Sequence, residues 1–212
     1  MPNEGVHVID HPVLAHQLAT LRRRETDPAR FRATLAGMSR MLAYEATRDL
    51  PTRNASIETP MEKMDGAREL AETPLVVSIM RAGNGMLGGV LELIPSAEVG
   101  HIGIYRDRFI HSTVEYYFRL PDRLEEKTVL LLDPLLATGY TASAAIRRIR
   151  EQGSGPIRML CVLASREGIE RVREASPDTV IYCASIERAL DERGFLLPGI
   201  GDAGDRLYGT VR

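Results

Sequence analysis

The sequence predicts an α/β protein with a doubly wound, mostly parallel central sheet. Residues 75–80, 128–132 and 157–165 are almost entirely apolar or β-branched and show no alternation, as in strands buried on both faces of a parallel sheet. Each run is followed by apolar residues at helical spacing. Repeated strand–helix units join parallel strands through right-handed crossovers, so helices are expected on both faces of the sheet.

The first expected elements are a short strand, VHVI at residues 6–9, and two helices. Apolar residues recur at helical spacing over 11–21 and 28–50. Asp27 precedes a proline, and aspartate caps a helix while proline suits its first position, so the second helix should begin there. Residues 52–74 are mixed and polar, compatible with a strand and a turn.

The middle of the chain continues the alternation of strand and helix. We expect a helix over 87–93 and a strand over 99–105. Apolar and aromatic residues alternate within 107–120, which predicts a β-hairpin arm that projects from the sheet.

The second half is expected to complete the sheet. A helix over 142–150 should begin at a Thr141 cap. A strand, a helix and a strand are expected over 157–165, 167–175 and 179–185. The glycines and the proline of residues 194–210 predict a C-terminal loop.

Composition is that of a globular protein with one domain. Hydrophobic residues make up 44% and charged residues 26% of the 212 residues, as in typical domains, so one domain is expected over 1–212. A formal net charge of −2 argues against a nucleic-acid partner, because nucleic-acid binding needs a basic surface. The run Arg22–Arg24 lies on a helical pattern and is interpreted as a solvated helix face.

The cysteines and histidines give no sign of a metal or redox site. Cys161 and Cys183 lie in apolar strand-like runs without Cys-x-x-Cys spacing, which favours core packing over a disulfide, a metal pair or a nucleophile. Such thiols, with no secretory segment and no apolar run of membrane-spanning length, predict a cytoplasmic protein without a membrane partner. The histidines show no ligand spacing, so a metal held by protein nitrogens is not expected.

Two predicted strand-to-helix turns carry residues suited to phosphate. Asp133 and Pro134 follow the strand 128–132, and small and hydroxylated residues precede the next helix; in open α/β sheets such a helix N-terminus holds phosphate. Arg81 follows the strand 75–80 and precedes Ala-Gly-Asn-Gly, where glycines allow close approach and a guanidinium grips phosphate oxygens. On layout alone, an ordinary turn with a surface charge is an equal interpretation at Asp133 and the favoured one at Arg81.

These motifs resemble those of the uracil phosphoribosyltransferase family. DPLLATGYT (133–141) is similar to the family's loop for phosphoribosyl pyrophosphate (PRPP), RAG (81–83) to its pyrophosphate loop, and PGIGDAGD (198–205) to its uracil-binding segment. MLAYEATRDLPT (41–52) is similar to the end of its long helix. The resemblance covers nearly the whole chain, about residues 11–210, with the motifs in the family's order.

The resemblance implies a phosphoribosyltransferase-like fold of type I and a role for particular residues. The catalytic set would be Arg81, Arg106, Asp133 and Asp202. PRPP would be bound by Arg81, Arg106, Asp133, Pro134, Leu135, Leu136, Ala137, Thr138, Gly139, Tyr140, Thr141 and Asp202. Residues 194–210 would form the uracil-binding tail, with Leu196, Gly201, Asp202 and Ala203 at the base. Related enzymes also carry a non-proline cis peptide in the arginine loop.

The implied reaction transfers the phosphoribosyl group of PRPP to N1 of uracil and gives UMP and diphosphate in pyrimidine salvage. Mg²⁺ would arrive with PRPP, and Asp202 would contact it through water. The arm implies a homodimer or a higher homo-oligomer, and GTP as an effector is left open. Two alternatives also stay open: a nucleotide-sensing, RNA-binding relative of the same fold, and a catalytically silent protein that binds phosphate ligands.

The chain departs from the family pattern at two places. Tyr140 stands where a second glycine is usual and Thr141 where serine is commoner, and we expect the Tyr140 ring to point away from the phosphate. Residues 107–110 (DRFI) stand where the family carries a pair of glutamates. This second departure leaves open the traits that depend on the charge of the arm.

Overall fold

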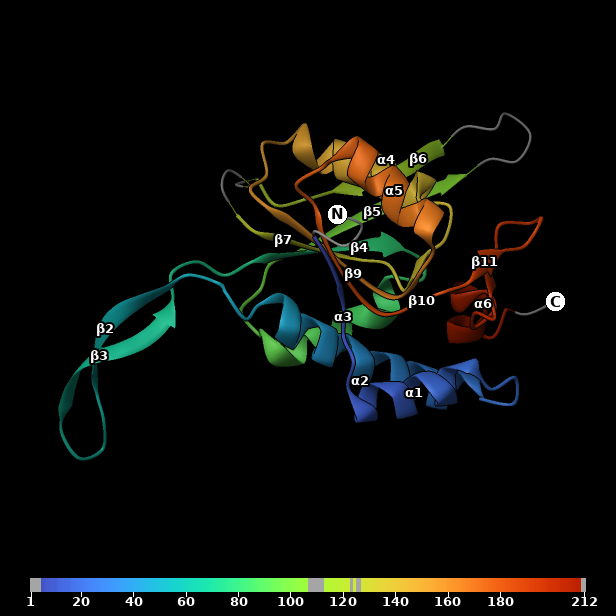
Figure 1. Cartoon of the computed structure of the whole chain (residues 1–212). Helices are drawn as coiled ribbons and strands as arrows, with labels where there is room; N and C mark the ends of the chain where they lie inside the picture. Colours follow the sequence, from blue (N-terminus) through green and yellow to red (C-terminus); the bar gives the residue numbers. More distant parts are fainter. Residues whose placement is uncertain (1–4, 107–112, 123, 125–126, 211–212) are drawn as a thin grey trace.

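The computed structural model describes residues 5–106, 113–122, 124 and 127–210. Its centre is a sheet in the order β1-β10-β9-β7-β4-β5-β6 (Figure 1), in which every neighbouring pair is parallel except β5 and β6. These strands are β1 (Val6–Val8), β4 (Leu75–Met80), β5 (Val99–Arg106), β6 (Thr113–Arg119), β7 (Val129–Leu132), β9 (Ile157–Ala164) and β10 (Val180–Ile186). A short strand, β8 (Leu135–Leu136), also pairs with β9. The predicted mostly parallel sheet is confirmed.

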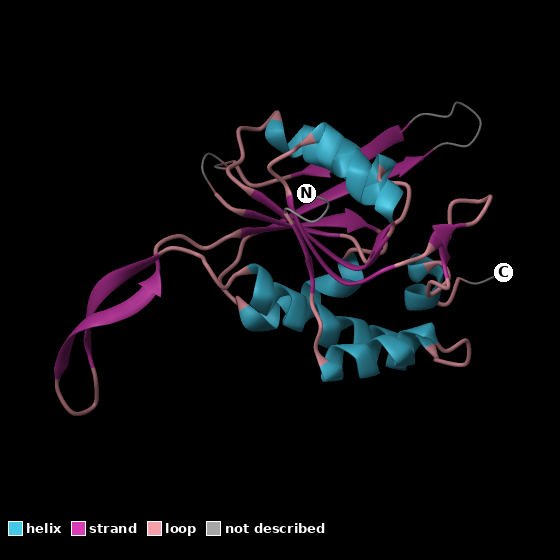
Figure 2. Ribbon diagram, in the orientation of Figure 1, coloured by secondary structure: helices cyan, strands magenta, loops and turns pink. Residues whose placement is uncertain are grey.

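Helices cover both faces of this sheet, as Figure 2 shows. One face packs against α4 (Tyr140–Arg150) and α5 (Arg166–Ala175), and the other against α1 (Pro12–Arg22), α2 (Pro28–Ala46) and α3 (Asn84–Leu93). Successive residues of a central strand serve opposite cores: Leu131 of β7 joins the first cluster and Leu130 the second. Because both faces are covered, the central strands carry no polar alternation. The doubly wound prediction is confirmed.

The helix starts show which capping predictions hold. Asp27 caps α2 as predicted, since its Oδ1 accepts a hydrogen bond from the Arg30 amide at 2.9 Å. The predicted cap at Thr141 is wrong, because α4 already begins at Tyr140 and its N-cap is Gly139. Gly139 has φ +78°, a left-handed conformation that glycine adopts without a Cβ clash. The chain can therefore turn into the helix before it reaches the threonine.

The most prominent projection lies in a stretch whose sequence pattern is weak. β2 (Thr52–Glu58) and β3 (Lys63–Leu70) form a separate antiparallel pair that extends away from the body (Figure 1), here called the β2–β3 arm. Nearly every residue of it is exposed, so it has no buried face and no period-two pattern. The predicted arm over 107–120 is different: β6 pairs with β5 at the edge of the central sheet, and residues 107–112 lie outside the described part.

The C-terminal segment contains more regular structure than the predicted loop. It includes the strand β12 (Leu196–Leu197), which pairs with β11 (Ala189–Leu190), and a short helix, α6 (Ala203–Tyr208), capped by Asp202. The Leu197–Pro198 peptide bond is cis, and so is Met80–Arg81, in agreement with the non-proline cis peptide expected for the arginine loop.

The two cysteines lie in the core, as predicted. Cys161 of β9 and Cys183 of β10 are fully buried, free, and opposite each other in the parallel register. Within the described ranges, no helix combines the length and apolar character needed to cross a membrane.

Candidate active site

Three segments far apart in the sequence meet at the carboxyl ends of the central strands. They are the loop after β4, the loop after β7 and the C-terminal tail. Together they enclose a cavity of about 220 Å³, here called the strand-end pocket, which is lined by Ala82, Asp133, Leu135, Ala137, Gly194, Phe195, Leu196, Asp202, Ala203 and Gly204. Ligands of open α/β sheets bind at this edge, so the pocket is the candidate active site.

Asp133 is the acid at the exit of β7, and its environment favours the neutral carboxyl. Burial raises its pKa to about 7; the Leu135 amide at 3.5 Å lowers it, and the negative charge of Asp202 raises it further. The residue is half-buried at the pocket wall. A carboxyl that titrates near neutral pH and faces a second acid across a cavity is typical of a functional site.

The carbonyl groups of the loop after β7 accept hydrogen bonds from β9 and from Ser165, the N-cap of α5. The Pro134 carbonyl accepts from the amides of Val162 and Leu163, and the Leu136 carbonyl from the amide of Ser165 at 2.9 Å. The Ser165 hydroxyl donates to the Ala137 carbonyl. Because these carbonyls point toward β9 and α5, the loop is fixed ahead of α4, whose first-turn amides have no intrahelical acceptor. That helix start can bind an anion.

The Tyr140 ring is engaged by α5. The Arg171 guanidinium lies 3.7 Å from the ring centroid, within the range of a cation–π interaction. This contact fits the expectation that the ring faces away from the phosphate, which remains a prediction about a bound state.

The loop after β4 approaches the tail through Arg81. Its Nη2 lies 3.3 Å from Asp205 Oδ1, and its carbonyl accepts a hydrogen bond from the Tyr208 hydroxyl at 3.1 Å. Gly83 is packed so tightly that a Cβ would lie 2.6 Å from the Ile79 carbonyl oxygen, so the close turn depends on glycine. The Arg81 side chain itself is 57% exposed and is accessible to a ligand at this edge.

The structure brings together only part of the predicted site. Six predicted residues line the strand-end pocket: Asp133, Leu135, Ala137, Leu196, Asp202 and Ala203. Gly201 lies in a neighbouring cavity of about 400 Å³ that shares Asp202. The remaining PRPP residues lie on the adjoining loops and helix start: Arg81, Pro134, Leu136, Thr138, Gly139, Tyr140 and Thr141. Arg106 ends β5, but its side chain lies outside the described part.

Sequence reasoning missed several residues of this region. Phe195 and Gly194 line the pocket, and Asp205 and Tyr208 contact Arg81. Asp205 belongs to the same PGIGDAGD string as Asp202, so the motif carried a signal for it. Tyr208 had none, because its contact depends on the helix α6, where the sequence predicts a loop.

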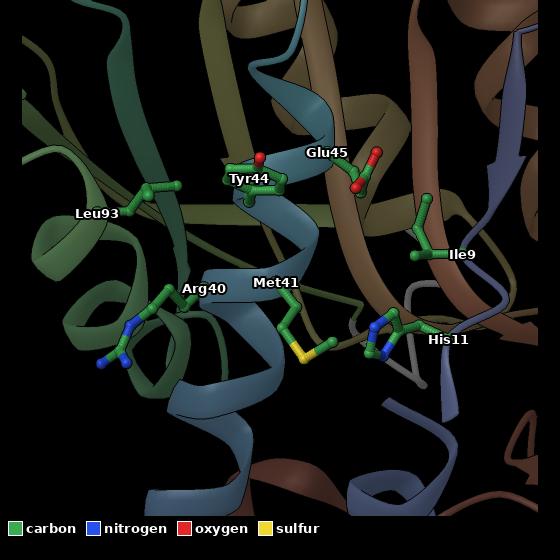
Figure 3. A pocket seen from close by; sticks show the side chains of 7 residues that line it. All are labelled: Ile9, His11, Arg40, Met41, Tyr44, Glu45 and Leu93. Carbon is green, nitrogen blue, oxygen red and sulfur yellow. The ribbon is translucent and has the colours of Figure 1, made fainter. Parts of the chain in front are cut away.

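A third cavity, of about 290 Å³, lies elsewhere (Figure 3). It is lined by residues from the segment between β1 and α1, from α2 and from α3: Ile9, His11, Arg40, Met41, Tyr44, Glu45 and Leu93. None of the predicted site residues lines it. Among the residues that the structure describes, no cluster of three or more histidines, cysteines or acids could hold a metal ion.

Comparison with known proteins gives a consistent result. The family model described as uracil phosphoribosyltransferase matches residues 8–210. A curated uracil phosphoribosyltransferase of Agrobacterium fabrum is 48% identical over 207 residues, which are 98% of this chain and 99% of that protein. A solved structure from Aquifex aeolicus has a TM-score of 0.91 at 34% identity and covers 96% of this chain and 97% of its own. A hypoxanthine-guanine phosphoribosyltransferase from Bacillus anthracis, with a TM-score of 0.50, 9% identity and coverage of 75% and 80%, shares the fold alone.

Proposed function

Because the chain belongs to the uracil phosphoribosyltransferase family, we propose that the strand-end pocket is the place where it transfers a phosphoribosyl group. The enzyme converts PRPP and uracil to UMP and diphosphate. One observation carries the assignment of the site: Asp133, from the loop after β7, and Asp202 and Ala203, from the tail, share one cavity. This supports a pocket in which ribose and base would lie side by side.

The loop after β7 serves the ribose 5-phosphate. The Asp133 carboxylate accepts hydrogen bonds from the ribose hydroxyls. The amides at the start of α4, from Thr138 to Thr141, surround the phosphate, and no acidic side chain in the first turn opposes it. Both the unpaired amides and the helix dipole favour an anion there.

The arginines serve the diphosphate. As the bond from the anomeric carbon to the diphosphate oxygen breaks, negative charge collects on the leaving group. Arg81 and Arg106 stabilise that charge in the transition state. Arg81 lies beside Asp205, and we expect the diphosphate to replace this half-buried partner. No nucleophilic side chain is needed, because the uracil nitrogen attacks directly.

The donors of the pocket also suit Mg²⁺ brought by PRPP. Mg²⁺ keeps several waters and is held by one or two carboxylates together with substrate phosphates. Asp133 and Asp202 are close enough for the charge of one to raise the pKa of the other, an arrangement that a cation relieves. When bound, Mg²⁺ neutralises charge on the diphosphate. Asp202 would contact the ion through water, and its Oδ1 already accepts a hydrogen bond from the Asp205 amide at 2.9 Å.

The tail reads the base through its main chain. Uracil offers two carbonyl acceptors and N–H donors, which amides and carbonyls of a closely approaching backbone can match. Leu196, Gly201, Asp202 and Ala203 are assigned to this role. Leu196 and Ala203 are almost fully buried, at 5% and 2% exposure. The base would therefore bind against residues whose positions are already fixed by packing.

We also propose that the enzyme is at least a homodimer. A two-stranded hairpin alone is marginally stable, and the β2–β3 arm exposes apolar side chains: Ile57, Met61, Met64 and Leu70. A second copy that covers the arm would bury them. Sedimentation of wild type and of Met61→Glu, whose side chain is 91% exposed, tests this proposal; a monomeric wild type contradicts it. The two free cysteines support the proposed cytoplasmic location.

A turnover assay tests the proposed function. PRPP is supplied with uracil, cytosine, hypoxanthine or orotate, with and without GTP, and the nucleotide product is identified. UMP formation with a strong preference for uracil is expected, and any dependence on GTP is read in the same assay. Filter binding to RNA and the absence of turnover would instead favour the RNA-binding or the silent alternative.

A further inference from the structure

A largely buried ion pair binds the main chain of the tail on both sides of one residue, at the amide and at the carbonyl of Gly199. Glu187, just after β10, has a side chain only 2% exposed. Its Oε2 accepts a hydrogen bond from the Gly199 amide at 2.7 Å, and Arg22 of α1 donates to the Gly199 carbonyl at 3.0 Å. Arg22 and Glu187 also meet bidentately, at 2.6 and 2.9 Å. Arg22, Glu187 and Gly199 are here called the Gly199 clamp.

The clamp lies between the two parts of the tail that line the strand-end pocket. Leu196 precedes Gly199, and Asp202 and Ala203 follow it. Gly199 has φ +64°, and a Cβ at this position would collide with the Leu196 carbonyl. The turn at Gly199 therefore brings the chain so close to Leu196 that only glycine fits without a steric clash. The relative placement of Leu196 and Ala203 depends on how this one residue is held.

The electrostatics of the clamp favour the ionised carboxylate of Glu187. Burial alone would raise the pKa of Glu187, but the Arg22 guanidinium and the Gly199 amide outweigh it and hold the pKa below its usual value. Ser185 adds a hydrogen bond at 3.2 Å. A bidentate arginine–carboxylate pair is geometrically specific, so it fixes a position as well as a charge.

A separate contact keeps the tail docked without the clamp. The Arg206 guanidinium of α6 donates to the Ile200 carbonyl at 3.0 Å and to the Arg23 carbonyl at 2.6 Å. It also lies 4.5 Å from the centroid of the Phe31 ring. Loss of the clamp should consequently shift the Gly199 turn locally and leave the tail attached to the N-terminal helices.

We propose that Glu187 and Arg22 are positioning residues that set the geometry of the uracil-reading main chain, and through it the selectivity for uracil. The proposal rests on the proposed function of the tail as the base site. Neither side chain is assigned to a substrate. Their effect passes through the two peptide groups that flank Gly199. It should fall mainly on the base, because the loop assigned to the PRPP phosphate is held separately by β9 and α5.

The test compares clamp variants with a matched ion pair. Glu187→Gln keeps the shape and removes the charge, Arg22→Met removes the guanidinium, and Arg22→Lys restores a charge without the bidentate geometry. The control is Arg158→Met: Arg158 is 12% exposed and joins the amino end of β9 to the end of α2 through the Ala46 carbonyl and Asp49. Measured for each are Tm, kcat, KM for both substrates, the uracil-to-cytosine ratio and uracil affinity by calorimetry.

The clamp variants should raise the KM and Kd for uracil roughly ten- to hundredfold, since small misplacements of a site cost on this scale. The KM for PRPP should stay within about twofold. The preference for uracil over cytosine should become smaller. The uracil KM of Arg22→Lys should lie between the values of wild type and Arg22→Met. Arg158→Met should lower Tm and leave both KM values unchanged.

Two results would overturn the proposal. One is a loss of Tm in Glu187→Gln with unchanged uracil KM and Kd; the other is an equal rise of both KM values. If Arg22→Met does not fold, Glu187→Gln decides. A wild type that binds uracil but forms no UMP counts against the proposed function only, because calorimetry still measures the clamp.

Discussion

The Tyr208 hydroxyl donates a hydrogen bond to the main-chain carbonyl of Arg81 at 3.1 Å, so the last helix of the protein holds the loop that follows β4. The Asp205 carboxylate, one turn earlier on α6, lies beside the same arginine. The proposed base site and the proposed diphosphate site are thereby linked through one short helix. Each can still be probed separately, because the hydroxyl acts on the loop backbone and not on the base.

Tyr208→Phe should lower kcat/KM for PRPP and leave the uracil KM unchanged. The variant removes one hydrogen bond of a half-exposed residue, worth about 0.5–1.5 kcal/mol, which corresponds to roughly a two- to tenfold loss. Steady-state kinetics with each substrate varied in turn measures it. Tyr44→Phe, on the exposed side of α2, is the matched control and should behave as wild type. Unchanged PRPP kinetics in Tyr208→Phe would show that the loop keeps its geometry without the tail.

Arg81→Ala and Arg106→Ala should each lose turnover strongly, while uracil affinity changes little. Removal of one preorganised donor costs about 2.7–4 kcal/mol in the transition state, or a hundred- to thousandfold in kcat. Single-turnover rates and uracil calorimetry separate the two effects. Losses of tenfold or less in both variants would remove the arginines from the diphosphate role.

The sequence is most informative where residues are buried on both sides. The strands β4 and β7 can be predicted because a continuous apolar run as short as LVVSIM, bounded by charged and turn residues, is typical of a strand buried on both faces. The β2–β3 arm cannot, because its exposed strands have no face to bury and hence no hydrophobic period. Likewise the prediction of a loop at α6 is wrong, since glycines surround this helix and its cap, Asp202, stands out only as a site residue.

The candidate site likewise has residues that the sequence identifies and supporting contacts that it does not. Family motifs identify Asp133 and Asp202, and their shared cavity is a property of the fold that places a strand exit beside the tail. The contacts that support the tail cannot be predicted from local patterns, because Arg22 and Glu187 lie 165 positions apart. The interpretation of the run Arg22–Arg24 as a solvated face is wrong for Arg22, which is half-buried in the clamp.

The pKa of Asp133 predicts an acid limb in the activity profile. With a pKa raised to about 7, chiefly by burial, the free enzyme holds a protonated carboxyl below neutral pH, and this form offers the ribose one acceptor fewer. The value of kcat/KM for PRPP should therefore rise with pH through about 7, since this parameter reports the free enzyme. Asp202→Asn removes a charge that raises this pKa and should move the limb to lower pH. If kcat/KM rises at the same pH in wild type and in Asp202→Asn, the ionisation belongs to a group other than Asp133.

The same group predicts a pH effect on stability. The folded pKa lies above the unfolded value of 3.8, so the folded state binds the proton more tightly and this stabilisation is lost as pH rises from about 4 to about 7. Asp133→Asn cannot ionise and should gain Tm relative to wild type above pH 7, with a smaller difference at pH 4. Each kcal/mol corresponds to about 2–4 °C for a protein of this size. A Tm difference that does not depend on pH would contradict the assignment.

Tyr140→Gly should leave the KM for PRPP within a few-fold of wild type. The ring lies against Arg171 of α5, so we expect phosphate binding to depend on the main chain of the loop and not on this side chain. The variant loses a cation–π contact of about 0.5–1 kcal/mol and helix propensity, so Tm should fall. Arg171→Met, which removes the same contact and keeps the ring, separates these causes. A collapse of PRPP binding in Tyr140→Gly alone would place the ring at the ligand.

The base site is tested most directly at Ala203, the first residue of α6. The residue is 2% exposed and lines the pocket, so Ala203→Val keeps the amide and pushes the pocket wall inward. The KM for uracil should rise far more than the KM for PRPP.

Asp202→Asn should chiefly lower kcat, because asparagine still caps the helix but loses the charge near the diphosphate. Ala43→Val, buried in the same apolar cluster but on α2, controls for overpacking, which costs about 1–3 kcal/mol of stability. A main-chain reader leaves polar groups unpaired when cytosine enters, and such a mismatch can cost about 10⁴–10⁵ in specificity. If Ala203→Val leaves the uracil KM unchanged, or cytosine is used as readily as uracil, the tail does not read the base.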